Sequence, residues 1–237
     1  MPEQTKSVRP QKGPQEAFLC SPADVVVFGG AAGGGKTWAL LVEPIRHINN
    51  PEFGAVLFRR TSPEITNHGG LWDESRKLYP HLQAKPNLND LSWTFPTGAK
   101  VRFSHLQHSS DVHSWQGAKV PLIGFDQLEH FEEFQFFYLL TRNRSLCGVR
   151  PYVRATCNPD ADSWLAKFIA WWIDPNTGMP IPERAGVLRW FVRGEDEKIV
   201  WADTKEELEQ HYRMPNGEPV PAKSVTFIPS KLADNPI

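Results

Sequence analysis

A glycine-rich stretch near the amino terminus has the residue types and spacing that bind a phosphate. Residues 30–37 read G-x-x-x-x-G-K-T, and glycines allow backbone N–H groups to point together at phosphate oxygens. The lysine would neutralise the β- and γ-phosphates of a nucleotide, and the threonine hydroxyl would bind Mg²⁺. The following helix would direct the positive end of its dipole at the same anion. The predicted nucleotide ligands are Gly30, Gly33, Gly34, Gly35, Lys36 and Thr37.

The sequence on either side of this stretch has the order that a phosphate loop requires. Residues 24–29 form a short apolar, β-branched run typical of a buried parallel strand, and residues 38–43 are good helix formers. The alternative is a glycine-rich turn with an accidental lysine and threonine. That alternative does not account for a strand before the loop and a helix after it.

Polar residues also follow the apolar run at 120–125. Asp126 ends this run, ninety residues after Lys36, and an acid there would hold Mg²⁺ through water; the alternative is a helix-capping aspartate. Hydrolysis further needs a group that positions and deprotonates water. Gln127 can orient water but cannot accept a proton, so we favour Glu129 as the base. Glu129 could instead be a first-turn helix acid stabilised by the helix dipole.

Three further residues are candidates by position. Thr156 and Asn158 end the strand predicted at 152–159, where such side chains can sense the γ-phosphate; a turn capped by Asn-Pro is the alternative. Gln15 lies fifteen residues before the phosphate loop, where a glutamine reads the adenine edge in several P-loop motors. It could equally be a surface residue at the start of a helix.

Four arginines could stabilise charge on the γ-phosphate, in cis or from a neighbouring subunit. Arg142 and Arg144 follow the helix predicted at 131–141, and Arg59 and Arg60 end the second predicted strand. Each of them could instead be an ordinary ion-paired or solvated arginine.

Strands alternate with helices, which predicts an α/β fold of the P-loop NTPase type. Its central sheet should be mainly parallel and flanked by helices, with β-hairpin insertions. We expect residues 1–14 to form a flexible arm and residues 15–237 to form the ATPase domain, with a hairpin-containing insertion at about 174–222. The other predicted elements are helices at 14–19, 62–79, 131–141, 163–172 and 204–213, strands at 54–60 and 223–228, and hairpins pairing 92–95 with 100–103 and 186–193 with 198–201.

Composition sets outer limits on function. The chain has 237 residues, a formal net charge of −1 and a sequence pI of about 6.7, so any surface for nucleic acid must be local. Its three cysteines lack metal-binding spacing and fit a reducing cytoplasm. No apolar run reaches the length of a membrane span, so we expect no membrane partner.

Taken in order, these segments resemble the ATPase domain of the large terminase subunit of tailed bacteriophages. The resemblance covers nearly the whole chain. It is carried by residues 29–37, 57–61 (LFRRT), 93–100 (WTFPTGAK), 116–118 ahead of 122–126 (LIGFD), 138–145 (YLLTRNRS), 154–159 (RATCNP), 227–230 (FIPS) and 234–236 (DNP).

The resemblance implies an ATP-driven motor, with Mg²⁺ as cofactor, that pumps double-stranded DNA into a procapsid. It also implies self-association into a ring, docking on a portal protein, a small terminase subunit that recognises the genome, and location in the host cell cytoplasm. Such proteins continue into an RNase H-like nuclease domain. Because this chain stops at Ile237, we expect an amino-terminal fragment without nuclease activity.

The sequence departs from that family in three places. Gln127 replaces the usual glutamate, which leaves the catalytic base open. Gln116 stands where many relatives have an arginine assigned to the neighbouring subunit's site, and Ala31 and Ala32 stand where some relatives have an arginine. The second and third departures leave the arginine finger open.

Two alternative functions remain. A helicase-like ATPase would need a second motor domain, for which 237 residues leave no room. A nucleotide-binding assembly module of a DNA-processing complex would bind ATP with little hydrolysis of its own. Gln127 keeps this second alternative open, and sustained phosphate release would exclude it.

Overall fold

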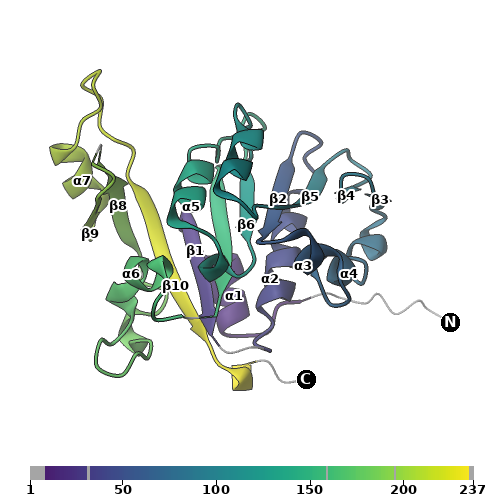
Figure 1. The fold of residues 1–237 in the computed structure, drawn as a ribbon, viewed down its shortest axis with the longest axis horizontal. Helices are drawn as coiled ribbons and strands as arrows, with labels where there is room; N and C mark the ends of the chain where they lie inside the picture. Colours follow the sequence, from purple (N-terminus) through teal and green to yellow (C-terminus); the bar gives the residue numbers. More distant parts are fainter. Residues whose placement is uncertain (1–8, 31–32, 159, 195, 235–237) are drawn as a thin grey trace.

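The computed structural model describes residues 9–30, 33–158, 160–194 and 196–234, and it is organised around one sheet (Figure 1). The sheet has ten strands in the order β3-β4-β5-β2-β6-β7-β1-β10-β8-β9. The strands are β1 Val25–Gly30, β2 Gly54–Arg59, β3 Lys85–Asn87, β4 Ser92–Thr94, β5 Lys100–His105, β6 Leu122–Phe125, β7 Tyr152–Cys157, β8 Arg189–Arg193, β9 Ile199–Ala202 and β10 Lys223–Ser230.

The six central strands, from β5 to β10 in sheet order, run parallel, which confirms the predicted mainly parallel sheet. Strand β7 lies between β1 and β6, in register with both. Because the strands are parallel, the loops that follow β1, β2, β6 and β7 meet at one edge, called here the carboxyl edge. The opposite edge, where these strands begin, is called the amino edge.

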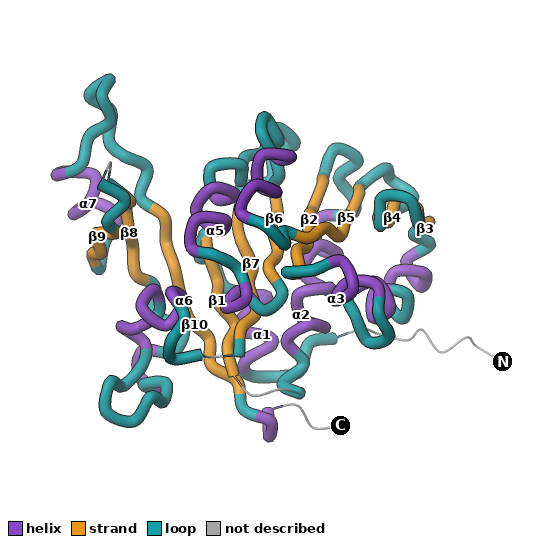
Figure 2. Tube along the Cα trace, viewed as in Figure 1, coloured by secondary structure: helices purple, strands orange, loops and turns teal. Residues whose placement is uncertain are grey.

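Helices cover both faces of the sheet (Figure 2). In β1, Val26 and Phe28 pack on one side with α1 to α4, and Val25 and Val27 pack on the other with α5 and α6. Two buried faces explain the continuous apolar run in this strand. The helices are α1 Pro14–Cys20, α2 Lys36–Val42, α3 Ser62–Thr66, α4 Leu71–Ser75, α5 Glu133–Leu140, α6 Trp164–Phe168 and α7 Lys205–His211, with short 3₁₀ turns at Glu43–His47, Tyr79–Leu82, Ser109–Trp115, Leu128–His130, Ala170–Trp172, Pro182–Arg184 and Leu232–Asp234.

Antiparallel strands extend the sheet at both ends. The two predicted hairpins form, as β4 with β5 and as β8 with β9. Strand β5 also pairs in parallel with β2, and β8 pairs with β10, so both hairpins belong to the main sheet. That residues 174–222 are an insertion stays a prediction. Glu195, which falls between the two strands of the second predicted hairpin in the sequence, and residues 1–8 of the expected arm lie outside the described residues.

Two of the predicted helices are wrong in extent. The helix predicted at 62–79 is broken into α3 and α4, because Gly69 adopts a φ of 78° and Asn67 is extended. A Cβ on Gly70 would lie 2.5 Å from the Ile65 carbonyl oxygen, so the glycine permits the tight turn between them. The helix predicted at 163–172 stops at Phe168 and continues only as a 3₁₀ turn. Among the helices described, none is long and apolar enough to cross a membrane.

Candidate nucleotide-binding site

The phosphate loop connects β1 to α2 at the carboxyl edge of the sheet. Gly33 and Gly35 adopt φ angles of 85° and 68°, in the region that favours glycine. The Lys36 ammonium donates a hydrogen bond to the Gly30 carbonyl oxygen at 2.8 Å. Burial lowers the pKa of this ammonium, because the charged form loses hydration. The negative charge of a bound phosphate would stabilise the charged form of the Lys36 ammonium. Ala31 and Ala32 lie outside the described residues.

Asp126 follows β6 and lies beside the phosphate loop, with only 1% of its surface exposed. The Thr37 hydroxyl is 3.3 Å from Asp126 Oδ1 and 3.4 Å from Oδ2. The Thr156 hydroxyl, on β7, donates to Oδ1 at 2.6 Å. The Arg59 guanidinium, at the end of β2, places Nε 2.7 Å from Oδ2. Three elements thus hold one buried carboxylate beside the loop.

Gln127 is fixed in an unusual conformation next to this carboxylate. Its φ is 62°, a left-handed value that costs about 1–3 kcal/mol in a residue other than glycine and persists only when neighbours hold it. Its backbone N–H donates to the Thr156 hydroxyl oxygen at 3.0 Å, and the Arg59 guanidinium donates to its side-chain oxygen. Thr156 and Arg59 therefore hold Gln127 in this conformation.

Glu129 lies one 3₁₀ turn beyond Gln127. Its Oε1 accepts a hydrogen bond from the Asn158 backbone N–H at 2.9 Å, and its buried Oε2 has no hydrogen-bond partner among the described residues. Burial raises the pKa of the Glu129 carboxyl, and the Asp126 charge adds to this rise. The buried side-chain oxygen of Asn158 likewise has no partner in the described part of the chain. Two unsatisfied acceptors therefore lie near the phosphate loop.

A pocket of about 350 Å³ opens between these groups. It is lined by Gly33, Gly34, Gly35, Lys36, Thr37, Trp38, Arg59, Asp126, Gln127, Thr156 and Asn158. Most of the predicted site residues therefore come together here. Glu129 does not line the pocket, whereas Gln127 does.

A second pocket, of about 290 Å³, adjoins the first because Gly35 and Trp38 line both. Arg9, Gln11 and Gln15 complete its walls. Gln15 is 4% exposed, and its side-chain oxygen accepts a hydrogen bond from the Gln11 N–H at 3.1 Å. If the first pocket held the phosphates of a nucleotide, the nucleotide base would enter the second pocket. The predicted contact between Gln15 and adenine would have to lie there.

The donor set at Asp126 fits Mg²⁺. This ion prefers oxygen ligands and is held in such sites by one or two protein oxygens, waters and substrate phosphates. The Thr37 hydroxyl and the Asp126 carboxylate supply protein oxygens that lie 3.3 Å apart. No group of three or more His, Cys, Asp or Glu side chains in the described residues could hold a metal alone, so the phosphates of the substrate would have to complete the shell.

Arg142 and Arg144 lie away from both pockets. The Arg142 carbonyl accepts a hydrogen bond from Val120 N–H, just ahead of β6, which places these arginines at the amino edge. Arg60 also points away from the nucleotide pocket and pairs with Glu132, with Nη2 3.2 Å from Oε1. A role for Arg142 or Arg144 in this chain's own pocket is not supported by their position, and a role in a neighbour's pocket stays a prediction.

Sequence reasoning did not assign Trp38, and it named Arg59 only as one of four possible fingers. Trp38 is two residues past Lys36 on α2, so its helical position was a usable signal. Arg59 reaches Asp126 only because β2 lies beside β6, which no local pattern of the sequence reveals.

Residues 27–230 match the family described as "Terminase large subunit, T4likevirus-type, N-terminal". The chain belongs to this family. The match spans the phosphate loop, Asp126 and the strand that carries Thr156. No curated protein matches the sequence significantly.

Solved terminase structures share the fold. The large terminase of a thermophilic bacteriophage matches with a TM-score of 0.56 and 14% identity, over 96% of this chain and 47% of that one. The ATPase domain of the Thermus phage P74-26 large terminase matches with a TM-score of 0.52 and 13% identity, over 75% of this chain and 84% of that domain. The chain thus spans about half the length of the first of these two terminases.

Proposed function

We propose that this chain is the ATP-hydrolysing motor domain of a viral terminase large subunit, which moves double-stranded DNA into a procapsid. The observation that carries the proposal is the convergence of Lys36, Thr37 and Asp126 on one pocket at the carboxyl edge. Membership of the terminase family supports the packaging context.

Each group in the pocket has a defined task in this proposal. The loop N–H groups and Lys36 hold the β- and γ-phosphates, while Thr37 and Asp126 hold Mg²⁺. The ion, when bound with ATP, supplies positive charge where the leaving oxygen becomes negative. Thr156 touches both Asp126 and the Gln127 backbone, so it can transmit the presence of the γ-phosphate to the end of β7.

The attacking water needs a proton acceptor and an orienting group. Glu129 is the proposed acceptor, because burial has raised its pKa towards the range useful for a base. Gln127, which lines the pocket, is the proposed orienting group. Movement of Glu129 away from the Asn158 N–H would bring its carboxylate to that water.

Membership of the terminase family supports a wider assembly. We propose a ring of these subunits, docked on a portal protein in the host cytoplasm and supplied with genome by a small terminase subunit. The ring would allow Arg142 or Arg144 of one subunit to reach the pocket of the next.

Phosphate release by the purified chain and by Lys36→Ala tests the proposal. Removal of the ammonium should lower turnover at least about 100-fold, the usual cost of one preorganised electrostatic group. Lys167→Ala, an exposed lysine on α6, is the matched control and should behave as the unchanged chain. Equal turnover by all three proteins would remove the phosphate loop from the mechanism.

The second candidate is an assembly module in which bound ATP joins subunits. It is favoured by Gln127 in the position of the usual acid and by Arg59 paired to Asp126. Sustained release of many phosphates per protein would exclude it, and stoichiometric binding without release would support it.

A further inference from the structure

The amino edge of the sheet, opposite the nucleotide pocket, carries a concentration of arginine and lysine. In the segments 19–24, 43–52, 118–121 and 141–154, six arginines and lysines stand against three acids, although the whole chain has a net charge of −1. The stretch 141–154 alone holds four arginines and no acid. These six residues are called here the basic edge: Arg46, Lys119, Arg142, Arg144, Arg150 and Arg154.

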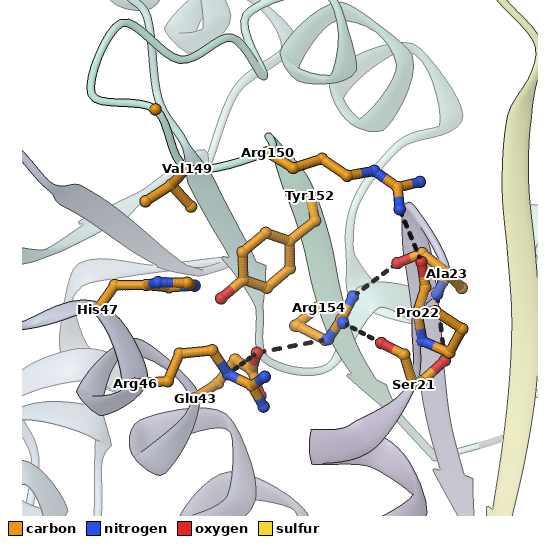
Figure 3. Close-up of a pocket in the computed structure, with 11 residues that line it drawn as sticks. Ser21, Pro22, Ala23, Glu43, Arg46, His47, Val149, Arg150, Tyr152 and Arg154 are labelled. Atoms are coloured by element: carbon orange, nitrogen blue, oxygen red, sulfur yellow. Dashed lines mark hydrogen bonds and ion pairs between the residues drawn. The ribbon is translucent and has the colours of Figure 1, made fainter.

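A pocket of about 440 Å³ is lined by three of the six residues of the basic edge (Figure 3). The guanidinium groups of Arg46, Arg150 and Arg154 surround it, together with Tyr152 and His47. The side chains of Arg46 and Arg150 are 42% and 60% exposed, so both reach solvent at its mouth.

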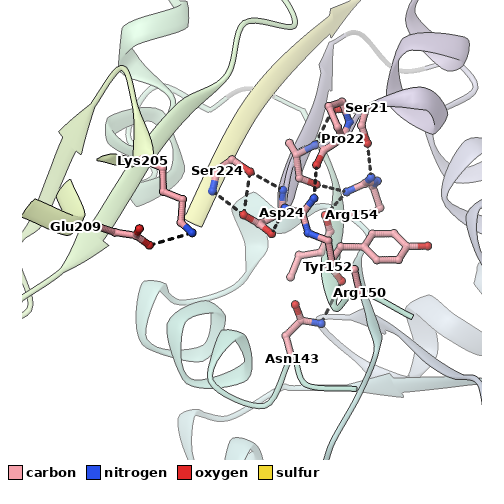
Figure 4. A network of polar contacts seen from close by, with 12 residues as sticks. Ser21, Pro22, Asp24, Asn143, Arg150, Tyr152, Arg154, Lys205, Glu209 and Ser224 are labelled. Carbon is pink, nitrogen blue, oxygen red and sulfur yellow. Dashed lines mark hydrogen bonds and ion pairs between the residues drawn. The ribbon is translucent and has the colours of Figure 1, made fainter. Parts of the chain in front are cut away.

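Two buried acids fix these arginines without using all of their donors. Asp24 accepts from Arg150 Nη2 at 2.6 Å and is itself held by Ser224 (Figure 4). Glu43 lies 3.0 Å from Arg46 Nε. A guanidinium has five N–H donors, and within the described residues Arg150 donates hydrogen bonds to Asp24 and to the Pro22 carbonyl oxygen. Donors therefore remain for an anion at the pocket mouth.

Tyr152 lines the same pocket. The residue is 8% exposed, and its hydroxyl interacts with the Glu43 carboxyl, the acid that also holds Arg46. Figure 3 shows this hydroxyl within the group formed by His47, Arg46 and Glu43. Tyr152 thus helps to fix Glu43, and through it Arg46, at the pocket wall.

The neighbouring arginines are held rigidly next to the pocket. Asn143 is 5% exposed, and its side-chain nitrogen donates to the carbonyl oxygens of Val120, Pro121 and Tyr152. These hydrogen bonds of Asn143 connect the loop that contains Arg142 and Arg144 to the starts of β6 and β7. Within the described residues, no carboxylate lies within 4 Å of the charged atoms of Lys119, Arg142 or Arg144.

We infer that the basic edge is a DNA-binding face whose central pocket seats a backbone phosphate. The planar guanidinium group of arginine can donate two parallel hydrogen bonds to phosphate oxygens. Because the cations are spread along an edge, a ligand with repeating negative charges fits them better than a ligand with a single carboxylate. Strands lie about 4.8 Å apart, so the starts of β6, β7 and β1 span roughly 10 Å. Along the helix axis, one DNA strand has a phosphate about every 3.4 Å, so about three fall within that length when the axis is aligned with the edge. The inference rests on the proposed function for its choice of double-stranded DNA.

Because β7 begins in this face and ends at Thr156 beside Asp126, one strand connects the DNA-binding face with the nucleotide pocket. DNA contact and nucleotide state would therefore act on opposite ends of the same element.

The test measures binding of a fluorescent DNA duplex by anisotropy, without nucleotide, over a series of salt concentrations. The variants are Lys119→Glu and Arg150→Ala, alone and together. The control is Lys167→Glu on α6, which matches the charge change of Lys119→Glu at a distance from the basic edge. Each lost phosphate contact should reduce the slope of log affinity against log salt by about 1. The double variant should bind at least about tenfold more weakly, and the control should bind as the unchanged chain.

Three outcomes would overturn the inference. The first is an equal loss in the control and the double variant, and the second is no measurable duplex binding by the unchanged chain at low salt. The third is displacement of the duplex by polyglutamate as effectively as by competitor DNA, which would indicate an acidic protein partner. Because the assay contains no nucleotide, its failure is distinguishable from failure of the ATPase proposal, which phosphate release reports.

Discussion

Arg59 and Asp126 form an ion pair inside the nucleotide pocket, with Arg59 Nε 2.7 Å from Asp126 Oδ2. Asp126 is the acid expected to hold Mg²⁺, so a protein cation already occupies one side of the metal ligand. The same guanidinium donates to the Gln127 side chain, whose amide is the proposed orienting group for water. In the proposed mechanism, Arg59 would therefore be a positioning residue that connects metal binding to the placement of Gln127.

Replacement of Arg59 by alanine should separate these two effects. Without the competing cation, Mg²⁺ should half-saturate the ATP-bound protein at a several-fold lower concentration. Turnover should nevertheless fall by about 10- to 100-fold, because a misplaced orienting group costs rate. Steady-state phosphate release against Mg²⁺ concentration measures both quantities.

Arg60→Ala is the matched control, since Arg60 is the adjacent arginine but pairs with Glu132 and Gln135 outside the pocket. Its Mg²⁺ dependence should equal that of the unchanged chain. If the two variants show the same Mg²⁺ curve, Arg59 does not compete with the ion.

The sequence contains local signals for some of the residues that line the site but not for all of them. The positions of the phosphate loop and Asp126 were predictable because each follows a strand whose apolar run is visible in a few residues, and Thr156 lies near the end of such a strand. Arg59 was not, because its role depends on β2 lying beside β6, a contact between residues 68 apart. The break at residues 67–70 was missed for a related reason: two glycines in a helical pattern lower helix propensity, but only the packing of α3 on α4 selects the turn.

The catalytic base can be identified from the pH dependence of turnover. A base acts as the carboxylate, so activity falls as pH falls through its pKa. Burial raises the pKa of Glu129 above 4.5, so the acid limb of the turnover profile should lie above that value. Glu129→Gln should lose most turnover while still binding ATP, whereas Gln127→Ala should lose less and keep the acid limb. The opposite ranking of the two variants would assign the water to the Gln127 amide and remove Glu129 as the base.

Gly30 joins the phosphate loop to the end of β10 and should not tolerate a side chain. Its φ is 145°, and an added Cβ would lie 1.9 Å from the Ser230 carbonyl oxygen. Gly30→Ala should lower the free energy of unfolding by at least about 1–3 kcal/mol, the cost of such a backbone conformation. Displacement of β10 would add to this cost. Urea denaturation measures the change.

Gly54→Ala is the control for the glycine variant, because no heavy atom lies within 4 Å of a Cβ at that position at the start of β2. It should change the free energy of unfolding by less than about 1 kcal/mol, through the unfolded chain alone. Equal stability of the two variants would mean that the close approach of Gly30 to Ser230 is absent in solution.

The position of Arg144 at the amino edge leads to a prediction about subunit exchange. Arg144 donates to the Thr141 carbonyl oxygen and lies at the edge opposite Asp126, so it can serve a γ-phosphate only in a neighbouring subunit. Phosphate release per molecule should then rise with protein concentration.

Lys36→Ala and Arg144→Ala should each be nearly inactive alone, and their mixture should regain activity. In the mixture, an intact phosphate loop from one variant meets an intact arginine from the other. The assay contains no DNA, so loss of DNA contacts at the basic edge does not enter it. Turnover that is independent of concentration, with no recovery on mixing, would place every catalytic group in one chain and leave Arg59 as the arginine nearest the phosphates.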